Sequence, residues 1–161
     1  RSPLGTATAS THDDKIVIAT VFRAGLPLHT GFLNMFDHAD NAFVSAFRFY
    51  KDDEHHIVDV HIEYIAAPSL NDRTLLLVDP MLATGESMEL AWKAFLTKGK
   101  PAKLQMACVI ASQQGVKHMA ELFPGDDVTL WCAAIDPVLD EHKYIVPGLG
   151  DAGDLAFGEK L

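Results

Sequence analysis

The sequence predicts an α/β fold of the doubly wound kind, in which a mainly parallel sheet is flanked by helices on both faces. Short runs of β-branched and apolar residues, typical of strands buried on both faces, recur along the chain. Helical patterns with one apolar stripe separate several of these runs, and such alternation is typical of a parallel sheet. The runs predicted as strands are residues 16–22, 42–49, 57–65, 75–78, 104–111 and 128–135.

The first elements place an arginine directly after a buried strand. Residues 4–9 are predicted as one arm of a hairpin, and residues 16–22 as the first strand with two buried faces. Arg23 and two small residues follow, so backbone there can come close to a ligand. Taken alone, Arg23 fits a solvated loop position better than a bidentate phosphate contact. A short helix is predicted over residues 28–36, before a polar turn.

A charged segment between the next two strands predicts a mobile lid. Arg48 stands near the end of the strand at residues 42–49. Residues 51–56 then carry one lysine, three acidic residues and two histidines before the strand at residues 57–65 begins. Polar excursions of this kind between strands are typical of lids over ligand sites.

The centre of the chain predicts a phosphate site. An apolar strand ends at Asp79, and a turn containing Thr84 and Ser87 leads into a helix. The first N–H groups of a helix carry partial positive charge, so with these hydroxyls they suit a phosphate. Asp79 beside such a site suits a ligand that also carries hydroxyls or a metal ion, as a sugar phosphate does. The apolar stripe of the helix is Met88, Ala91, Trp92, Phe95 and Leu96.

The second half of the chain repeats the strand, loop and helix order. Residues 112–115 are predicted as an exit loop after a strand, and residues 115–123 as a helix. Ligands of such sheets lie at the carboxyl ends of the strands. Arg23, Asp79 and the loop at residues 111–115 are therefore expected to gather at that edge.

Length, composition and charge limit the classes of protein to which this chain can belong. A chain of 161 residues that is 48% hydrophobic can bury one core, so residues 1–161 are predicted to form a single domain. The sequence has neither an apolar run of about 20 residues nor a signal-peptide pattern, so we expect a soluble, cytoplasmic protein with no membrane partner. A net charge of −9 argues against a nucleic-acid partner but not against a small anionic ligand. Cys108 and Cys132 fit buried positions better than a disulfide or a metal site.

Two sequence blocks resemble the type I phosphoribosyltransferases, and among them the uracil phosphoribosyltransferases. Residues 79–87, Asp-Pro-Met-Leu-Ala-Thr-Gly-Glu-Ser, are similar to that family's loop for phosphoribosyl diphosphate (PRPP). Residues 144–154, Tyr-Ile-Val-Pro-Gly-Leu-Gly-Asp-Ala-Gly-Asp, resemble its uracil-recognition segment. With Phe-Arg-Ala-Gly-Leu at residues 22–26, the likeness covers nearly the whole chain. It implies a type I phosphoribosyltransferase-like fold with a small C-terminal hood for the base, and it implies that the family's N-terminal segment is absent from this sequence.

The resemblance also implies the reaction and the residues that serve it. The phosphoribosyl group would pass from PRPP to uracil, giving UMP and diphosphate. Asp79, Arg23 and Arg48 would be catalytic, with Asp79 on the ribose hydroxyls and the arginines on the diphosphate. PRPP would also contact Pro80, Met81, Leu82, Ala83, Thr84, Gly85, Glu86, Ser87 and Asp151. Uracil would be bound by Ile145, Gly150, Asp151 and Ala152.

The implied cofactor is Mg²⁺, bridging diphosphate oxygens and held mostly by substrate and water rather than by a protein metal site. The implied assembly is a homodimer or a larger homo-oligomer.

Two departures from the family pattern keep an alternative open. Glu86 stands where the family usually has a second glycine, and its side chain is expected to turn to solvent. Leu155 replaces the basic residue that commonly follows the last aspartate of the tail block. The alternative is a regulatory or degenerate homologue of the same fold, which binds nucleotide without efficient turnover.

Overall fold

The computed structural model describes the chain except for residues 1, 9–14, 53–56, 126 and 160–161, and it describes residues 46–52 and 57–62 through their backbone only. A seven-stranded sheet has the strand order β3-β2-β1-β4-β6, with β7 and the short β5 also paired to β6. All neighbours in it run parallel except β3, which is antiparallel to β2. A second, two-stranded sheet joins β8 and β9.

The strands are β1 (Ile16–Val21), β2 (Asp40–Asp52), β3 (Ile57–Ala66), β4 (Thr74–Val78), β5 (Met81–Leu82), β6 (Lys103–Ser112), β7 (Val128–Asp136), β8 (Val138–Leu139) and β9 (Ile145–Val146). The helices are α1 (Leu26–Met35), α2 (Glu86–Phe95), which continues as the 3-10 turn Leu96–Lys98, α3 (Gln113–Leu122) and α4 (Ala152–Phe157).

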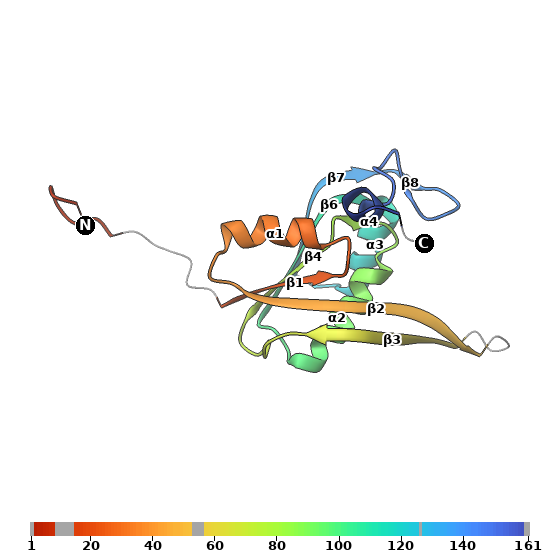
Figure 1. The fold of residues 1–161 in the computed structure, drawn as a ribbon, viewed down its shortest axis with the longest axis horizontal. Coiled ribbons are helices and arrows are strands. Elements are labelled where there is room, and N and C mark those ends of the chain that lie inside the picture. Colours follow the sequence, from red (N-terminus) through yellow and green to blue (C-terminus); the bar gives the residue numbers. More distant parts are fainter. Residues whose placement is uncertain (1, 9–14, 53–56, 126, 160–161) are drawn as a thin grey trace.

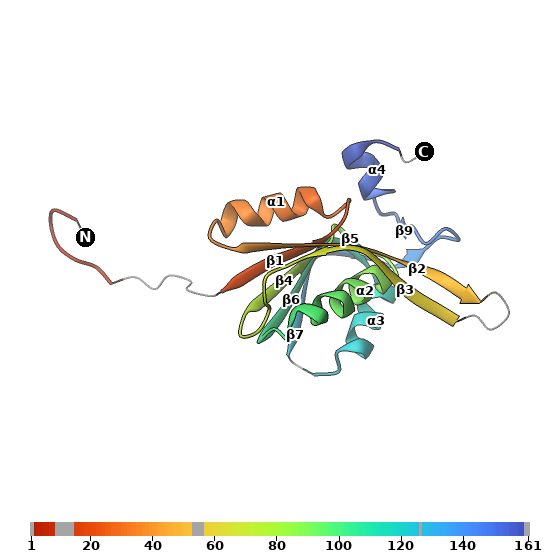
Figure 2. The same ribbon diagram turned by 60° about the horizontal axis from the view of Figure 1, so that its bottom comes forward.

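The helices form layers on both faces of the sheet, which confirms the predicted fold class. Figures 1 and 2 show α1 on one face, α2 and α3 on the other, and α4 beyond the sheet near β8 and β9. The larger core cluster lies between the sheet and α2, where Leu77, Met88 and Phe95 are fully buried. A smaller cluster centred on Ile18 packs against α1. Burial of these apolar side chains is the main stabilising contribution to the fold.

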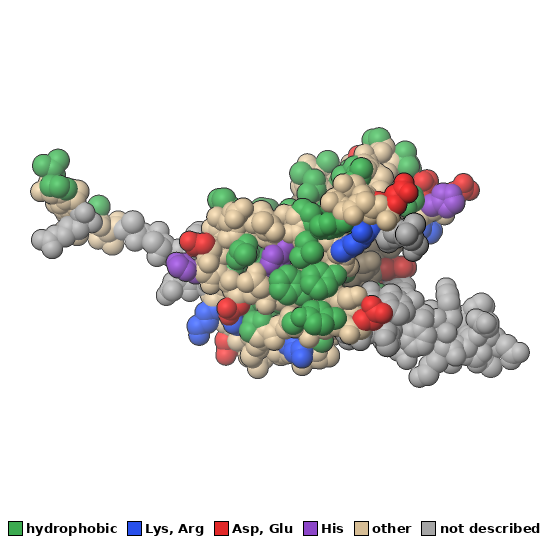
Figure 3. All heavy atoms as spheres, viewed as in Figure 1, with side chains coloured by type: hydrophobic (Ala, Val, Ile, Leu, Met, Phe, Trp, Pro, Cys, Tyr) green, Lys and Arg blue, Asp and Glu red, His purple; other side chains and the backbone are tan. Residues whose placement is uncertain are grey.

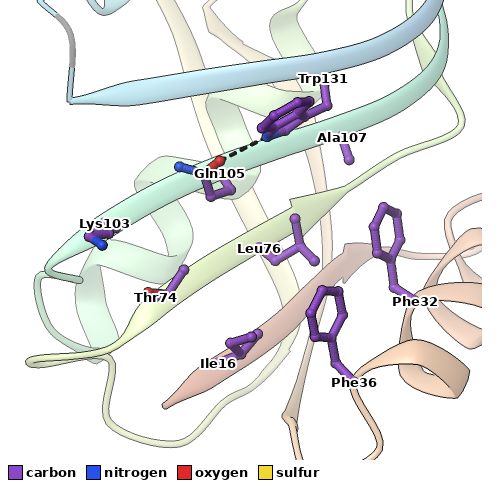
Figure 4. Close-up of a pocket in the computed structure, with 9 residues that line it drawn as sticks. All are labelled: Ile16, Phe32, Phe36, Thr74, Leu76, Lys103, Gln105, Ala107 and Trp131. Atoms are coloured by element: carbon purple, nitrogen blue, oxygen red, sulfur yellow. Dashed lines mark hydrogen bonds between the residues drawn. The ribbon is translucent and has the colours of Figure 1, made fainter. Parts of the chain in front are cut away.

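The face that carries α1 is covered only in part by the described residues. Beyond α1 an apolar cavity of about 580 Å³ opens over β4, β6 and β7, with Phe32 and Phe36 of α1 along one side (Figure 4). On the opposite side lies Trp131, which is 60% exposed and donates its indole N–H to Gln105 Oε1 at 2.8 Å. The edge strand β7 therefore has far less burial than the central strands.

Several predicted boundaries shift for local reasons. The helix predicted from residue 28 begins at Leu26, because Pro27 stands in its first turn, where its fixed φ suits a helix. The exit loop predicted at residues 112–115 is wrong: Ser112 accepts a hydrogen bond from the Gly115 N–H and caps α3, which begins at Gln113. The glycine-rich tail contains a short helix, α4, from Ala152 onward, which the sequence did not predict.

The predicted hairpin arm at residues 4–9 is also corrected. Ser2 and Gly5 form an isolated antiparallel bridge that closes a turn, and Leu4 within it is exposed. Ala9 and part of the predicted lid, residues 53–56, lie outside the described residues. No helix in the described part of the chain is long and apolar enough to cross a membrane.

Candidate active site

A cavity of about 580 Å³ lies at the carboxyl edge of the parallel strands. At this edge the Thr20 hydroxyl near the end of β1 donates to the Val78 carbonyl at the end of β4, at 3.0 Å, and so links the two strand ends. The cavity brings together the segment after β1, the segment after β4 and the C-terminal tail. Its lining residues are Phe22, Arg23, Ala24, Ser45, Asp79, Met81, Ala83, Ser87, Lys143, Tyr144, Gly150, Asp151, Ala152 and Gly153.

Asp79 lines this cavity directly after β4. Burial raises the pKa of its carboxyl from 3.8 to about 7, although the Met81 N–H, which donates to Oδ1 at 3.3 Å, acts in the opposite direction. The carboxyl therefore loses its proton near neutral pH rather than near pH 4. Such a group can accept hydrogen bonds from ligand hydroxyls once it is ionised.

The segment that follows Asp79 leads into the N-terminus of α2, as predicted. Gly85 caps this helix in the left-handed conformation (φ 87°), which glycine adopts without strain, and Thr84 Oγ1 accepts from the Glu86 N–H at 3.4 Å. The Glu86 side chain is exposed, as expected. Of the predicted loop residues, Met81, Ala83 and Ser87 line the cavity together with Asp79. Leu82 is buried, and Pro80, Thr84, Gly85 and Glu86 lie outside the lining.

The segment at α3 supports this loop from behind. The Ser112 hydroxyl donates to the Ala83 carbonyl at 2.6 Å and accepts from the Gly115 N–H at 2.9 Å. Gly115 packs so closely that a Cβ there would lie 2.6 Å from the Ala83 oxygen and 2.7 Å from the Leu82 oxygen. The expected gathering of residues 111–115 at this edge is confirmed, but these residues hold the loop and do not line the cavity.

Hydrogen bonds among side chains of α2 and α3 also support the start of α2. His118 of α3 lies against Gly85, where a Cβ would meet the His118 ring at 2.8 Å. Its Nε2 is 2.7 Å from Glu89 Oε2, and Lys93 donates to the other oxygen of the same carboxylate at 2.5 Å. Hydrogen bonds from Lys93 lower the pKa of Glu89 most, and those from His118 add to the shift.

Arg23 lines the cavity but is held by the tail. Its Nη2 donates to Asp154 Oδ1 at 2.6 Å and to the Gly158 carbonyl at 2.9 Å. The guanidinium also lies 5.9 Å from the centroid of the Phe157 ring. The resemblance had implied a diphosphate contact for Arg23 and no role for Asp154, so this pairing was not foreseen.

The tail forms the opposite wall through backbone and carboxylate groups. Asp151 caps α4 by accepting from the Asp154 N–H at 2.9 Å, and Gly150 and Ala152 line the cavity beside it. Ile145 does not line the cavity, since its side chain is buried. The Gly148 N–H donates to Asp136 Oδ2 at 2.9 Å, which ties the tail to the end of β7.

Arg48 was predicted as a site residue, whereas Phe22 and Lys143 were not. Arg48 belongs to β2, where its backbone pairs with Val60, but its side chain lies outside the described part of the chain. Phe22, which was not predicted as a site residue, stacks on Phe43 and Tyr64. Figure 3 shows hydrophobic side chains gathered on this face of the molecule. Lys143, also missed, lines the cavity with a positive φ of 69°. Its place directly before the glycine-rich block was the one available hint.

Comparison with known proteins agrees with this geometry. Residues 1–159 match the family model described as uracil phosphoribosyltransferase. The chain is 61% identical over 160 residues to uracil phosphoribosyltransferase of Porphyromonas gingivalis, a match that covers 99% of this chain and 73% of that protein. It is 38% identical over 159 residues to uracil phosphoribosyltransferase of Methanothermobacter thermautotrophicus, covering 98% of this chain and 70% of that protein.

Solved structures share the fold. The AQ2163 protein from Aquifex aeolicus superposes with a TM-score of 0.82 at 30% identity, covering 100% of this chain and 74% of that one. A purine phosphoribosyltransferase from Pyrococcus horikoshii superposes with a TM-score of 0.54 at 15% identity over 80% of this chain and 82% of that one, which shows the fold alone. The chain therefore belongs to the uracil phosphoribosyltransferase family.

Proposed function

We propose that this chain transfers the phosphoribosyl group of PRPP to N1 of uracil, giving UMP and diphosphate. One observation carries the proposal: the phosphate-type loop at Asp79 and the glycine-rich tail at Asp151 line one cavity of about 580 Å³, although these residues lie 72 positions apart in the sequence. A nucleotide has a phosphate at one end and a base at the other, so a site for it needs two unlike walls within reach of each other.

The phosphate end would be bound by backbone N–H groups. The N-terminus of α2 would offer its first backbone amides to the phosphate, and Ser87 of its first turn lines the cavity. The ionised Asp79 carboxylate would accept hydrogen bonds from the ribose hydroxyls. Arg23 and Arg48 would bind the diphosphate, which needs donors that strengthen as negative charge develops on it.

The base end would be read by the tail. Uracil carries carbonyl acceptors and an N–H donor on one edge, which the backbone groups of Gly150 to Ala152 can match. Cytosine would place an amino group where uracil has a carbonyl, leaving two donors face to face. An unpaired buried polar group costs about 1–3 kcal/mol, which corresponds to about 10- to 100-fold selectivity for uracil.

No covalent nucleophile is required, because the ribosyl carbon becomes cation-like as diphosphate leaves. The chain's own contribution is to hold the two substrates in line, to stabilise the departing charge and to exclude water.

A magnesium ion carried by the substrate fits these residues. Among the described residues no group of three or more His, Cys, Asp and Glu side chains could hold a metal ion. Asp79 and Asp151 are the two carboxylates in the cavity lining, and they would face an ion that arrives on the diphosphate. When bound, Mg²⁺ neutralises charge on the leaving diphosphate.

The test is a panel of nucleobases. The protein is incubated with PRPP, Mg²⁺ and either uracil, cytosine, orotate or hypoxanthine, and released diphosphate is measured. Diphosphate with uracil alone is expected; PRPP binding by calorimetry without turnover for any base would instead favour the degenerate or regulatory alternative. The homo-oligomeric state and the cytoplasmic location stay predictions, the first of which sedimentation velocity measures.

A further inference from the structure

Arg23 cannot keep its present hydrogen bonds to the α4 region and also bind a diphosphate through a bidentate pair. A guanidinium has two edges that form bidentate pairs with an oxyanion, Nε with Nη2 and Nη1 with Nη2, and Nη2 contributes one hydrogen to each edge. In this structure Nη2 donates to both Asp154 Oδ1 and the Gly158 carbonyl. Neither bidentate edge is then open to an incoming diphosphate.

The contact also fastens α4 to the sheet edge. A Cβ at Gly153 would lie 3.6 Å from the Ala24 Cβ and 3.7 Å from Arg23 Nε, so the first turn of α4 lies against the residues that follow β1. The centroid of the Phe157 ring lies 5.9 Å from the guanidinium carbon of Arg23. Arg23 is thus a principal polar attachment of a helix that is only six residues long.

We propose that Asp154 is a positioning residue that holds Arg23 on α4 in the ligand-free chain and yields it to the diphosphate of PRPP. Docking of α4 and bidentate binding of diphosphate then compete for one guanidinium. This inference rests on the proposed function, in which Arg23 binds diphosphate. By linkage, a change at Asp154 that weakens its pair with Arg23 must tighten diphosphate binding, and diphosphate must weaken the attachment of α4 by the same factor.

The pair is well placed for such an exchange. The side chains of Arg23 and Asp154 are 36% and 30% exposed, so water can replace either partner when the pair opens. Partly exposed ion pairs contribute modestly to stability, and the expected effect on diphosphate affinity is about two- to five-fold.

The experiment measures the affinity for inorganic diphosphate with Mg²⁺ by calorimetry at constant ionic strength. Asp154→Asn keeps the shape of the side chain and removes its charge, and it should bind diphosphate about two- to five-fold more tightly than the wild type. Glu159→Gln removes the same charge one residue beyond Gly158 and serves as the matched control, with unchanged affinity expected. Unchanged or weaker binding by Asp154→Asn would overturn the proposal.

Hydrogen exchange supplies a readout that a purely structural role would not move. In the wild type, diphosphate should increase exchange of the α4 amides, whereas in Asp154→Asn these amides should exchange fast before diphosphate is added. Protection of β1 and β4 in the same experiment reports whether the variant is folded. Unchanged α4 exchange in the wild type on adding diphosphate would contradict the competition.

A third variant separates this inference from the function on which it rests. Arg23→Gln should lose most of the affinity for diphosphate. If it binds as tightly as the wild type, the assignment of Arg23 to diphosphate is wrong, whatever Asp154→Asn does. If Arg23→Gln loses affinity but Asp154→Asn does not gain it, the proposed function stands and the competition fails.

Discussion

The two walls of the cavity are built in different ways. The loop from Asp79 to Ser87 lies between a buried strand and a buried helix, and Leu82 and Met88 within or beside it are 1% exposed. The tail instead carries exposed apolar residues such as Leu155 and Phe157, and its two-stranded sheet pairs only Val138 with Val146 and Leu139 with Ile145. We call the loop the phosphate wall and the tail the base wall, after the ligand groups proposed for them. Packing fixes the phosphate wall, while a few polar contacts fix the base wall.

The difference has a physical reason. Backbone amides bind a phosphate well only when their directions are set before the ligand arrives, since reorganisation would consume the interaction energy. A wall held by separate hydrogen bonds can open at low cost, because each one contributes only about 1 kcal/mol. The phosphate wall should thus have the same conformation in the free and the bound protein, and the base wall should move when substrates bind or leave.

The largest effect is expected from Asp79→Asn, measured as stability against pH. Because burial raises the pKa of Asp79 from 3.8 to about 7, the native state holds this proton more tightly than the unfolded chain does. The contribution of this proton to the free energy of unfolding is fully present below about pH 4. It is lost as the pH rises to about 7 and beyond, and the loss amounts to at most about 4 kcal/mol. The variant should therefore gain stability over the wild type as pH rises, and it should lose transferase activity.

Urea unfolding of both proteins at pH 4.5, 6 and 8 measures this difference directly, because other titrating groups cancel between them. Asp37→Asn, which removes an exposed carboxyl, is the matched control. A stability difference that stays constant across this pH range would show that the Asp79 proton is not held by the fold.

The next largest effect is expected from Gly115→Ala, which attacks the support of the phosphate wall. The new Cβ would meet the Ala83 and Leu82 carbonyl oxygens within 2.7 Å, so the loop must shift. Misplacement of a binding loop by about 1 Å can cost about 100-fold in rate, and kcat/KM for PRPP should fall by up to that factor. At Gly125 a Cβ would meet nothing within 4 Å, so Gly125→Ala is the control. Equal kinetics for the two variants would contradict the rigidity of this wall.

A smaller and more selective effect is expected from Asp136→Ala. The carboxylate accepts from the Gly148 N–H, so its loss should loosen the tail and raise KM for uracil by about five-fold. Global stability should change by less than about 1 kcal/mol, because the contact lies outside the packed core. Glu141→Ala, on an exposed side chain of the same hood, should leave both quantities unchanged. A large loss of stability in Asp136→Ala would show that the base wall belongs to the core.

The smallest effect concerns the carboxylate in the first turn of α2. Glu86→Gly should tighten PRPP binding about two-fold, because a negative charge leaves the neighbourhood of the phosphate. Glu86→Gln separates charge from backbone, since it keeps helix propensity. Weaker PRPP binding in both variants, measured by calorimetry, would show that the Glu86 side chain itself serves the ligand.

Local patterns in the sequence predicted the phosphate wall well. The strand at residues 75–78, the turn and the apolar stripe of the following helix are all short-range features, and the structure has them as β4, the loop and α2. The Arg23 position after the first strand followed in the same way. Buried strands and amphipathic helices can be predicted from the sequence because burial restricts the residue type at each position.

The base wall was predicted less well. The sequence resemblance marked Gly150, Asp151 and Ala152, but the helix α4, the strands β8 and β9 and the position of Lys143 were missed. Elements of two to six residues leave no periodicity to detect. Behind the phosphate wall, Ser112 was predicted as a loop residue although it caps α3.

By itself, the sequence determined where the sheet's main strands lie along the chain, the phosphate-type turn and the family, because each depends on neighbours along the chain. Only the tertiary structure decided that the tail closes over the strand ends, that burial raises the pKa of Asp79, and that Arg23 is held by Asp154. These properties depend on distances between residues far apart in sequence, and packing fixes such distances while composition and spacing do not.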